Sequence, residues 1–164
     1  MKTKMKTVLL ALVLVFIVCA ATSAQAKICY GATQGYWKNH PELWSDPSLT
    51  YNTETLVMNV FDNAHLVWYM MGPSPWKPSA WTFLDVLTIT LGYCSVHILV
   101  RQAVAALLNI QAFGTMYPLT AEQVIQKVND ALNSGGVYGV RDVKIDLAKE
   151  LEDYNNAGLP KGWP

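Results

Sequence analysis

The segment from Ser95 to about Ala112 constrains the fold most, because it predicts the longest helix of the chain. Apolar residues recur along it at steps of three and four, which is the period of one face of an α-helix. They are Val96, Leu99, Val100, Ala103, Val104, Leu107 and Leu108. An apolar face of this breadth is typical of a helix that other helices cover on several sides. The segment therefore predicts the central helix of an all-α bundle.

Four further helices are predicted around this one, from apolar periodicity and from capping and breaking residues. They span about 53–71, 80–91, 120–132 and 141–155. Thr120 and Gln123 have the spacing of a capping box. The β-branched run 86–90 leaves a strand as the alternative for part of the second range. We therefore expect a small helical bundle of about five helices.

The first 26 residues have the three parts of a cleavable signal peptide. Three lysines precede the apolar run Val8–Cys19, and Ala24-Gln25-Ala26 offers the small residues of a cleavage site. The run is shorter than the roughly 20 residues that span a bilayer, which disfavours a membrane anchor. A lipoprotein acylated at Cys19 is also disfavoured, because Val18 is bulky. We expect 1–26 to be removed and 27–164 to form one secreted or cell-surface domain.

Cleavage at this point changes the charge and leaves a slightly acidic domain. Three lysines are lost with residues 1–26 and no acidic residue is, so nine basic and twelve acidic residues remain. A nucleic-acid-binding domain would show a basic patch or stripe, so nucleic acid is not an expected partner. The apolar stretch 83–100 contains Asp85 and His97, and Arg101 follows it. A charged residue at mid-bilayer is costly, so we predict buried core helices and no membrane partner after cleavage.

Two cysteines, Cys29 and Cys94, remain after cleavage. Exported proteins meet an oxidising compartment, where such a pair usually forms a disulfide. In the chain-entropy model, closing a loop of about 65 residues would stabilise the fold by about 4 kcal/mol. The rival interpretation is two thiols, one of them buried as a small apolar residue.

The N-terminal segment of this domain is rich in aromatic residues and carries a motif. Residues 29–44 read CYGATQGYWKNHPELW. The segment resembles the pattern C-x-x-T-x-G-Y-W-K-x-H-x-x-x-W, which occurs near the N-termini of many exported bacterial and archaeal proteins. Those proteins often continue with segments similar to LILARQLIAAKLN and LA..LD.YNNG. Here residues 98–109 read ILVRQAVAALLN, and residues 147–156 read LAKELEDYNN.

The resemblance covers most of the mature chain in the same order, with three departures. The spacing from Cys29 to Thr33 is one residue longer than in the commonest form, and Ala157 stands between Asn156 and Gly158. Residues 62–92 are also longer and more aromatic than usual. The resemblance implies an exported domain of an uncharacterised family. It implies no catalytic residues.

The residues of this motif are the first candidates for a binding site. Tyr36, Trp37 and Trp44 would form an aromatic platform, with Lys38 and His40 as its polar rim. The competing interpretation is structural, because aromatic side chains bury a large area and anchor small cores. We favour the structural role and expect segment 27–51 to be mostly irregular, with one short helical turn at Pro41–Trp44.

Other chemistry has weaker support, and no metal or cofactor is expected. His40, His65 and His97 lack the spacing of known metal motifs. Cys94, three residues before His97, would be the sole nucleophile, and only as a thiol. Arg101 on the central helix needs an acidic partner if it is buried, and Asp85 or Asp153 would serve. Asn155 and Asn156 are expected to cap the end of the last helix, with ligand binding as the minor alternative.

These features favour a non-enzymatic binding or structural module whose ligand is a carbohydrate or another surface protein. The alternative is a small secreted hydrolase or a metal-dependent enzyme. A cleft that gathers at least three titratable groups would favour the enzyme, and an aromatic patch or groove without them would favour the module. A subunit of a larger surface assembly is a third interpretation, which an exposed apolar patch would support.

Overall fold

The computed structural model describes residues 29–62, 81–88, 95–134 and 143–164. Within these ranges the regular structure is helical, as predicted. The α-helices are α2 (Gln34–Asn39), α4 (Phe83–Thr88), α5 (Ser95–Phe113), α6 (Ala121–Asn133) and α7 (Val143–Asn155). Single 3-10 turns are η1 (Pro41–Leu43), η2 (Val57–Asn59) and η4 (Gly114–Met116). The predicted all-α bundle of about five helices is therefore confirmed.

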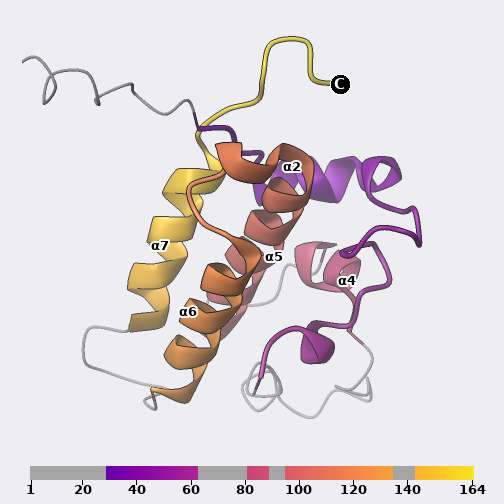
Figure 1. Ribbon diagram of the computed structural model, residues 1–164. Coiled ribbons are helices and arrows are strands. Elements are labelled where there is room, and N and C mark those ends of the chain that lie inside the picture. The colour runs from indigo at the N-terminus through magenta and orange to yellow at the C-terminus, as the bar shows by residue number, and fades with distance from the viewer. Residues whose placement is uncertain (1–28, 63–80, 89–94, 135–142) are drawn as a thin grey trace, which may run out of the picture.

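Helix α5 is the centre of the bundle. It packs against α7, α6, α2 and α4, with α6 and α7 alongside it and α2 across one of its ends (Figure 1). Leu99, Val104 and Leu107 have no exposed surface. Burying one such side chain stabilises the fold by about 1.5–3 kcal/mol. Several helices thus cover the broad apolar face that the sequence predicted for this helix.

The same helix is long and apolar enough to cross a membrane. Over Ser95–Met116, however, 72% of the most apolar window is buried inside the protein. A core helix of a soluble bundle passes the same test of length and composition, so this feature does not indicate a membrane span.

Helix α6 begins as the sequence predicted. The Thr120 hydroxyl accepts a hydrogen bond from the Gln123 backbone N–H at 3.3 Å, and the Gln123 side chain accepts one from the Thr120 N–H at 2.9 Å. This capping box satisfies two amide groups at the helix start. Val124 and Val128 are buried against the core.

The predicted helix 53–71 is wrong over its described part, residues 53–62. The Thr55 carbonyl accepts from the Phe83 N–H at 2.8 Å, and the Val57 N–H donates to the Trp81 carbonyl at 3.0 Å. Leu56 and Thr82 form an isolated antiparallel bridge. These pairings use backbone groups that an α-helix would need for itself. The remainder, 63–71, lies outside the described residues.

The N-terminal segment contains a helix that the sequence analysis did not predict. Thr33 caps α2, since its hydroxyl accepts from the Tyr36 N–H at 3.1 Å. Gly35 lies inside this helix and not in a tight turn. The helical turn expected at Pro41 is present as η1.

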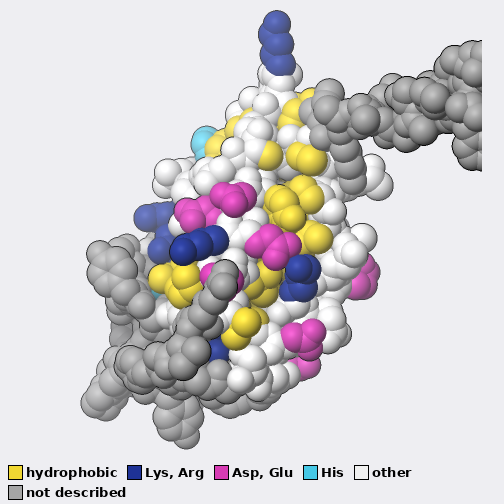
Figure 2. Space-filling model, turned by 90° about the vertical axis from the view of Figure 1, so that its left-hand side faces the viewer, with side chains coloured by type: hydrophobic (Ala, Val, Ile, Leu, Met, Phe, Trp, Pro, Cys, Tyr) yellow, Lys and Arg dark blue, Asp and Glu magenta, His cyan; other side chains and the backbone are white. Residues whose placement is uncertain are grey.

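The surface mixes charges of both signs. On the face that Figure 2 shows, Lys and Arg side chains lie beside Asp and Glu, with apolar side chains between them. This face therefore presents no broad field of one sign that would attract a polyanion.

Candidate functional site

The three segments that carry the motif resemblance meet around two buried asparagines. Asn109 of α5 is fully buried. Its Oδ1 accepts from the Ala32 N–H at 2.7 Å and from the Trp37 indole N–H at 3.0 Å. Its Nδ2 donates to the Ala32 carbonyl at 2.9 Å and to Asn155 Oδ1 at 2.8 Å. All four hydrogen-bonding positions of this amide are used.

Asn155 continues the network from the last turn of α7. Its Oδ1 also accepts from the Tyr117 hydroxyl at 2.9 Å. Its Nδ2 lies 3.0 Å from both the carbonyl and the Oε1 of Gln102. Burial, with smaller contributions from Tyr154 and Glu150, raises the pKa of the Tyr117 phenol. Asn155 is therefore a buried hub of the fold and not a simple helix cap.

We call Trp37, Gln102, Asn109, Tyr117 and Asn155 the amide network. Buried polar groups stabilise a structure when each has its partner, and these do. The sequence analysis missed this role. The available signal was the spacing of Gln102 and Asn109, seven residues apart on a mostly apolar helix, which places two amides on one face.

A close backbone contact lies beside the network. The Gly31 N–H donates to the Gly158 carbonyl at 3.0 Å, in an isolated antiparallel bridge. A Cβ on Gly31 would lie 2.2 Å from the carbonyl oxygen of Tyr154. Only glycine allows the N-terminal segment to approach α7 this closely.

The structure does not bring the five predicted binding residues together on one surface. Trp37 and Trp44 are 2% and 1% exposed, and the Trp44 indole N–H donates to the Trp37 carbonyl at 3.1 Å. Both indoles therefore serve the core. The rings of Tyr36 and His40, one helical turn apart, are in contact at a tilt of 33°, with centroids 4.5 Å apart. Lys38 is apart from both the buried indoles and the Tyr36–His40 pair, and it lines a pocket.

The Tyr36–His40 face is tied to its surroundings by polar contacts. The Tyr36 hydroxyl donates to the Pro164 carbonyl, and His40 Nδ1 lies 3.0 Å from a carboxylate oxygen of Glu42. The pKa of the exposed Glu42 carboxyl is lowered, mainly by a hydrogen bond from its own backbone N–H and then by His40.

Lys38 contributes to a hollow of about 340 Å³ between α2, α5 and the end of α7, which we call the polar pocket. All three motif segments supply its walls. The lining residues are Thr33, Gln34, Gly35, Lys38, Asn39, Arg101, Gln102, Glu152 and Asn156. Gln102 belongs both to this wall and to the amide network, so the network fixes one side of the pocket.

The two cations of the polar pocket are Lys38 and Arg101. Among the described residues, neither Lys38 nor Arg101 has a carboxylate within ion-pair distance. The expected pairing of Arg101 with Asp85 or Asp153 is absent there, and Asp85 accepts instead from the Thr82 N–H and hydroxyl, both at 2.9 Å. The Arg101 Nε atom is buried without a hydrogen-bond partner. Burial lowers the pKa of this guanidinium.

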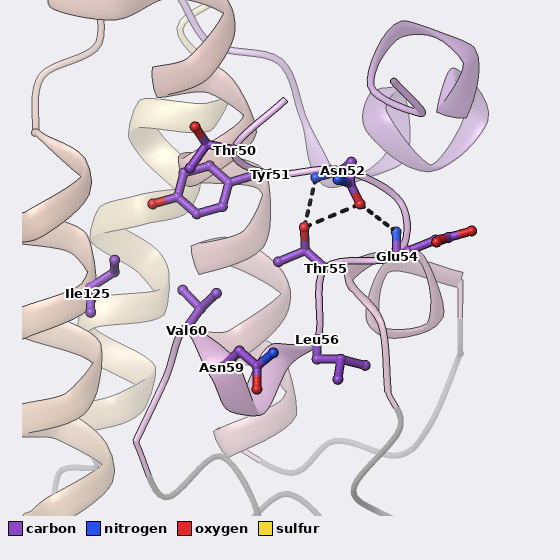
Figure 3. Close-up of a pocket in the computed structure, with 9 residues that line it drawn as sticks. All are labelled: Thr50, Tyr51, Asn52, Glu54, Thr55, Leu56, Asn59, Val60 and Ile125. Carbon is purple, nitrogen blue, oxygen red and sulfur yellow. Dashed lines mark hydrogen bonds between the residues drawn. The ribbon is translucent and has the colours of Figure 1, made fainter. Parts of the chain in front are cut away.

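A second hollow, of about 660 Å³, lies between segment 50–60 and α6. Figure 3 shows that Asn52, Glu54 and Thr55 of its lining are joined by hydrogen bonds. The Asn52 N–H donates to the Thr55 hydroxyl at 2.8 Å, and Asn52 Oδ1 accepts from the Glu54 N–H at 3.0 Å. These bonds hold the turn, and Glu54 is the one charged residue of the lining. The polar pocket is therefore the stronger candidate.

Other predicted chemistry cannot be placed in full. No group of three His, Cys, Asp or Glu side chains that could hold a metal occurs in 29–62, 81–88, 95–134 or 143–164. His65 and Cys94 lie outside these ranges. The Cys29–Cys94 disulfide and the reactivity of Cys94 therefore stay predictions.

The chain was compared with known proteins by sequence and by structure. No family model, no curated protein and no solved structure matches it. Function must therefore be argued from the polar pocket itself.

Proposed function

We propose that this chain is an exported, non-enzymatic binding module and that the polar pocket is its ligand site. The observation that carries the proposal is the convergence of all three motif segments on one hollow whose two cations lack acidic partners within the part of the chain that the structure describes. The signal-like residues 1–26 support export. The mature domain is thus proposed to act at the cell surface or outside the cell.

The polar pocket holds three titratable groups, Lys38, Arg101 and Glu152, and so meets the count that would favour an enzyme. Their chemistry favours binding. Arginine stays protonated and cannot act as a base. Glycoside hydrolysis uses two carboxylates on either side of the bond, and Glu152 is the one carboxylate of the lining. The Thr33 hydroxyl is engaged as the cap of α2.

The ligand we propose is a carbohydrate and not the surface of another protein. A standard protein interface buries about 800 Å² on each partner. A hollow of about 340 Å³ instead matches the small end of pockets for compact ligands. The amides in its walls suit sugar hydroxyl groups, since each offers a donor and an acceptor.

Retention on immobilised polysaccharides tests this proposal and separates it from the enzyme alternative. We expect the purified protein to bind at least one polysaccharide of a neutral and acidic panel, with no release of new reducing ends. Gly35→Met should abolish retention by filling the pocket. A Cβ at Gly35 meets only the Thr33 hydroxyl, at 3.6 Å, so this variant should fold.

Ser45→Met is the matched control, because Ser45 is exposed and does not line the pocket. It should bind as the unmodified protein does. Equal retention of both variants would refute the site, and accumulation of reducing ends would favour the hydrolase.

A further inference from the structure

We propose that the polar pocket is a carboxylate site and that its ligand is a hydroxylated monocarboxylate of monosaccharide size, which is the chemistry of a sugar acid. This inference rests on the proposed function and specifies its ligand. Four features support it: the Arg101 guanidinium, the net charge of the lining, the amides of the rim and the position of Gly35.

The Arg101 guanidinium is the strongest of these features. Its Nε atom is shielded from solvent and has no hydrogen-bond partner in the part of the chain that the structure describes. A buried donor left without a partner costs about 1–3 kcal/mol, and more when it is charged. A planar guanidinium fork matches the two oxygens of a carboxylate. The Nε atom itself is closed to solvent, so a bound carboxylate would meet the guanidinium group where Arg101 lines the hollow.

The charge balance of the lining favours a monoanion. Lys38 of α2 and Arg101 of α5 are the two cations, and Glu152 of α7 is the one anion. The lining therefore carries a formal net charge of about +1, from two cations and one anion. A dianion such as phosphate would leave excess negative charge beside Glu152. A carboxylate would neutralise the pocket.

The rim offers hydrogen-bonding groups that the fold does not use. Gln34, Asn39 and Asn156 line the pocket. Among the hydrogen bonds of the described residues, none involves their side-chain amides. Each amide can donate to and accept from a hydroxyl group. The ligand should therefore carry hydroxyl groups as well as a carboxylate.

Gly35 fits the same interpretation. It lies in α2 with ordinary helical geometry, and its φ is not positive. Its missing Cβ would meet nothing closer than 3.6 Å. Unlike Gly31, it therefore has no steric need to be glycine, although glycine in a helix costs up to about 1 kcal/mol relative to alanine. A bare backbone in the pocket wall leaves room for a ligand to approach closely.

Isothermal titration calorimetry with four soluble probes tests the inference on the purified protein. The probes are D-glucuronate, D-glucose, acetate and inorganic phosphate. We expect glucuronate to bind at least about tenfold more tightly than glucose, since one charge-assisted pair corresponds to a factor of this size. It should also bind more tightly than acetate, which has the carboxylate but no hydroxyl groups, and more tightly than phosphate. Arg101→Gln should abolish the preference of the protein for glucuronate over glucose. Lys38→Gln should reduce it by a smaller factor.

Lys127→Gln is the charge control, because Lys127 lies on α6 and pairs with Glu150 at 3.1 Å, away from the pocket lining. It should leave the glucuronate affinity unchanged. Circular dichroism verifies that each variant is folded.

The possible failures separate this inference from the proposed function. Equal binding of glucose and glucuronate, or tighter binding of phosphate, would overturn the carboxylate assignment. A third outcome would also overturn the carboxylate assignment: the protein retains a neutral polysaccharide, Gly35→Met abolishes that retention, and glucuronate does not bind. The proposed binding module would then stand. Failure of both the retention and the titration experiments would overturn both.

Discussion

The amide network and the polar pocket are built from neighbouring residues but differ in how their polar groups are satisfied. Three adjacent pairs supply both regions: Trp37 and Lys38, Gln102 and Arg101, Asn155 and Asn156. The first member of each pair is bonded inside the protein. The second lines the pocket, where Arg101 Nε has no described partner. The same motif segments therefore stabilise the fold through the amide network and present polar groups without described partners in the polar pocket.

Removing the centre of the amide network should have the largest effect. Asn109→Ala would leave the Trp37 indole N–H and the Ala32 N–H without their acceptor, and Asn155 would lose one of its partners. We expect a loss of about 3–5 kcal/mol in the free energy of unfolding, since each unsatisfied buried group costs about 1–3 kcal/mol. Urea denaturation measures it. Asn59→Ala, at an exposed asparagine, should change stability by less than about 0.5 kcal/mol. A comparable loss in both variants would contradict a special role for the network.

Two glycines four residues apart provide the next comparison. Gly31→Ala should destabilise the protein by about 2–4 kcal/mol, because its Cβ would meet the Tyr154 carbonyl oxygen at 2.2 Å. Gly35→Ala should instead be neutral or stabilise it by up to about 1 kcal/mol, through helix propensity. Thermal unfolding of both variants measures the difference. Similar melting temperatures would show that the close approach of Gly31 to α7 is not required.

The pH dependence of the free energy of unfolding tests whether the Tyr117 phenol is buried in the amide network. The pKa of its buried phenol is raised above the ordinary value of 10.0, so its stabilising contribution is complete below pH 10 and is lost as pH rises toward the folded-state pKa. At neutral pH, Tyr117→Phe should cost about 1 kcal/mol through the lost bond to Asn155. Above pH 10 the stability of the unmodified protein should fall toward that of the variant, by up to about 1.4 kcal/mol per pH unit. A stability difference that is independent of pH would refute burial of this phenol.

Replacing the buried cation of the polar pocket should stabilise the protein, whereas replacing a residue of the amide network should destabilise it. Arg101→Met would replace a desolvated, unpartnered donor with an apolar side chain of similar length. We expect the ligand-free protein to gain about 1 kcal/mol in unfolding free energy. Lys127→Met, which breaks an exposed ion pair, should change it by less than about 1 kcal/mol. A clear loss of stability on replacing Arg101 would instead give this residue a structural role.

The strength of the local signals explains which parts of the fold the sequence predicted. Helix α5 follows from its apolar periodicity, and α6 from the capping box at Thr120. Segment 53–62 has equally helical periodicity, yet its backbone bonds to Trp81 and Phe83. That pairing depends on residues distant in sequence, which periodicity does not report. Helix α2 was missed because it has only six residues and contains a glycine.

The candidate site was only partly predictable. Lys38 was expected in a binding site and lines the pocket, whereas Trp37 and Trp44 are core residues. Arg101 was expected to need a partner if buried, with a surface arginine as the open alternative, and its proximity to Lys38 was not foreseen. The position of a side chain around α2 decides between core, pocket and outer face. A helix of six residues has too few positions for its apolar periodicity to show which side faces the core.

The bond between Ala32 and Asn109 also has a consequence for the order of folding. Its partners are 77 residues apart in sequence, and the Gly31 bridge to Gly158 spans a still longer stretch. Contacts of such separation form late, because a long loop must be closed before they contribute. Synthesis delivers the aromatic N-terminal segment first, but its partners on α5 and α7 emerge only later. The polar pocket should thus be among the last features to assemble, so ligand binding would report that the whole chain has reached its final topology.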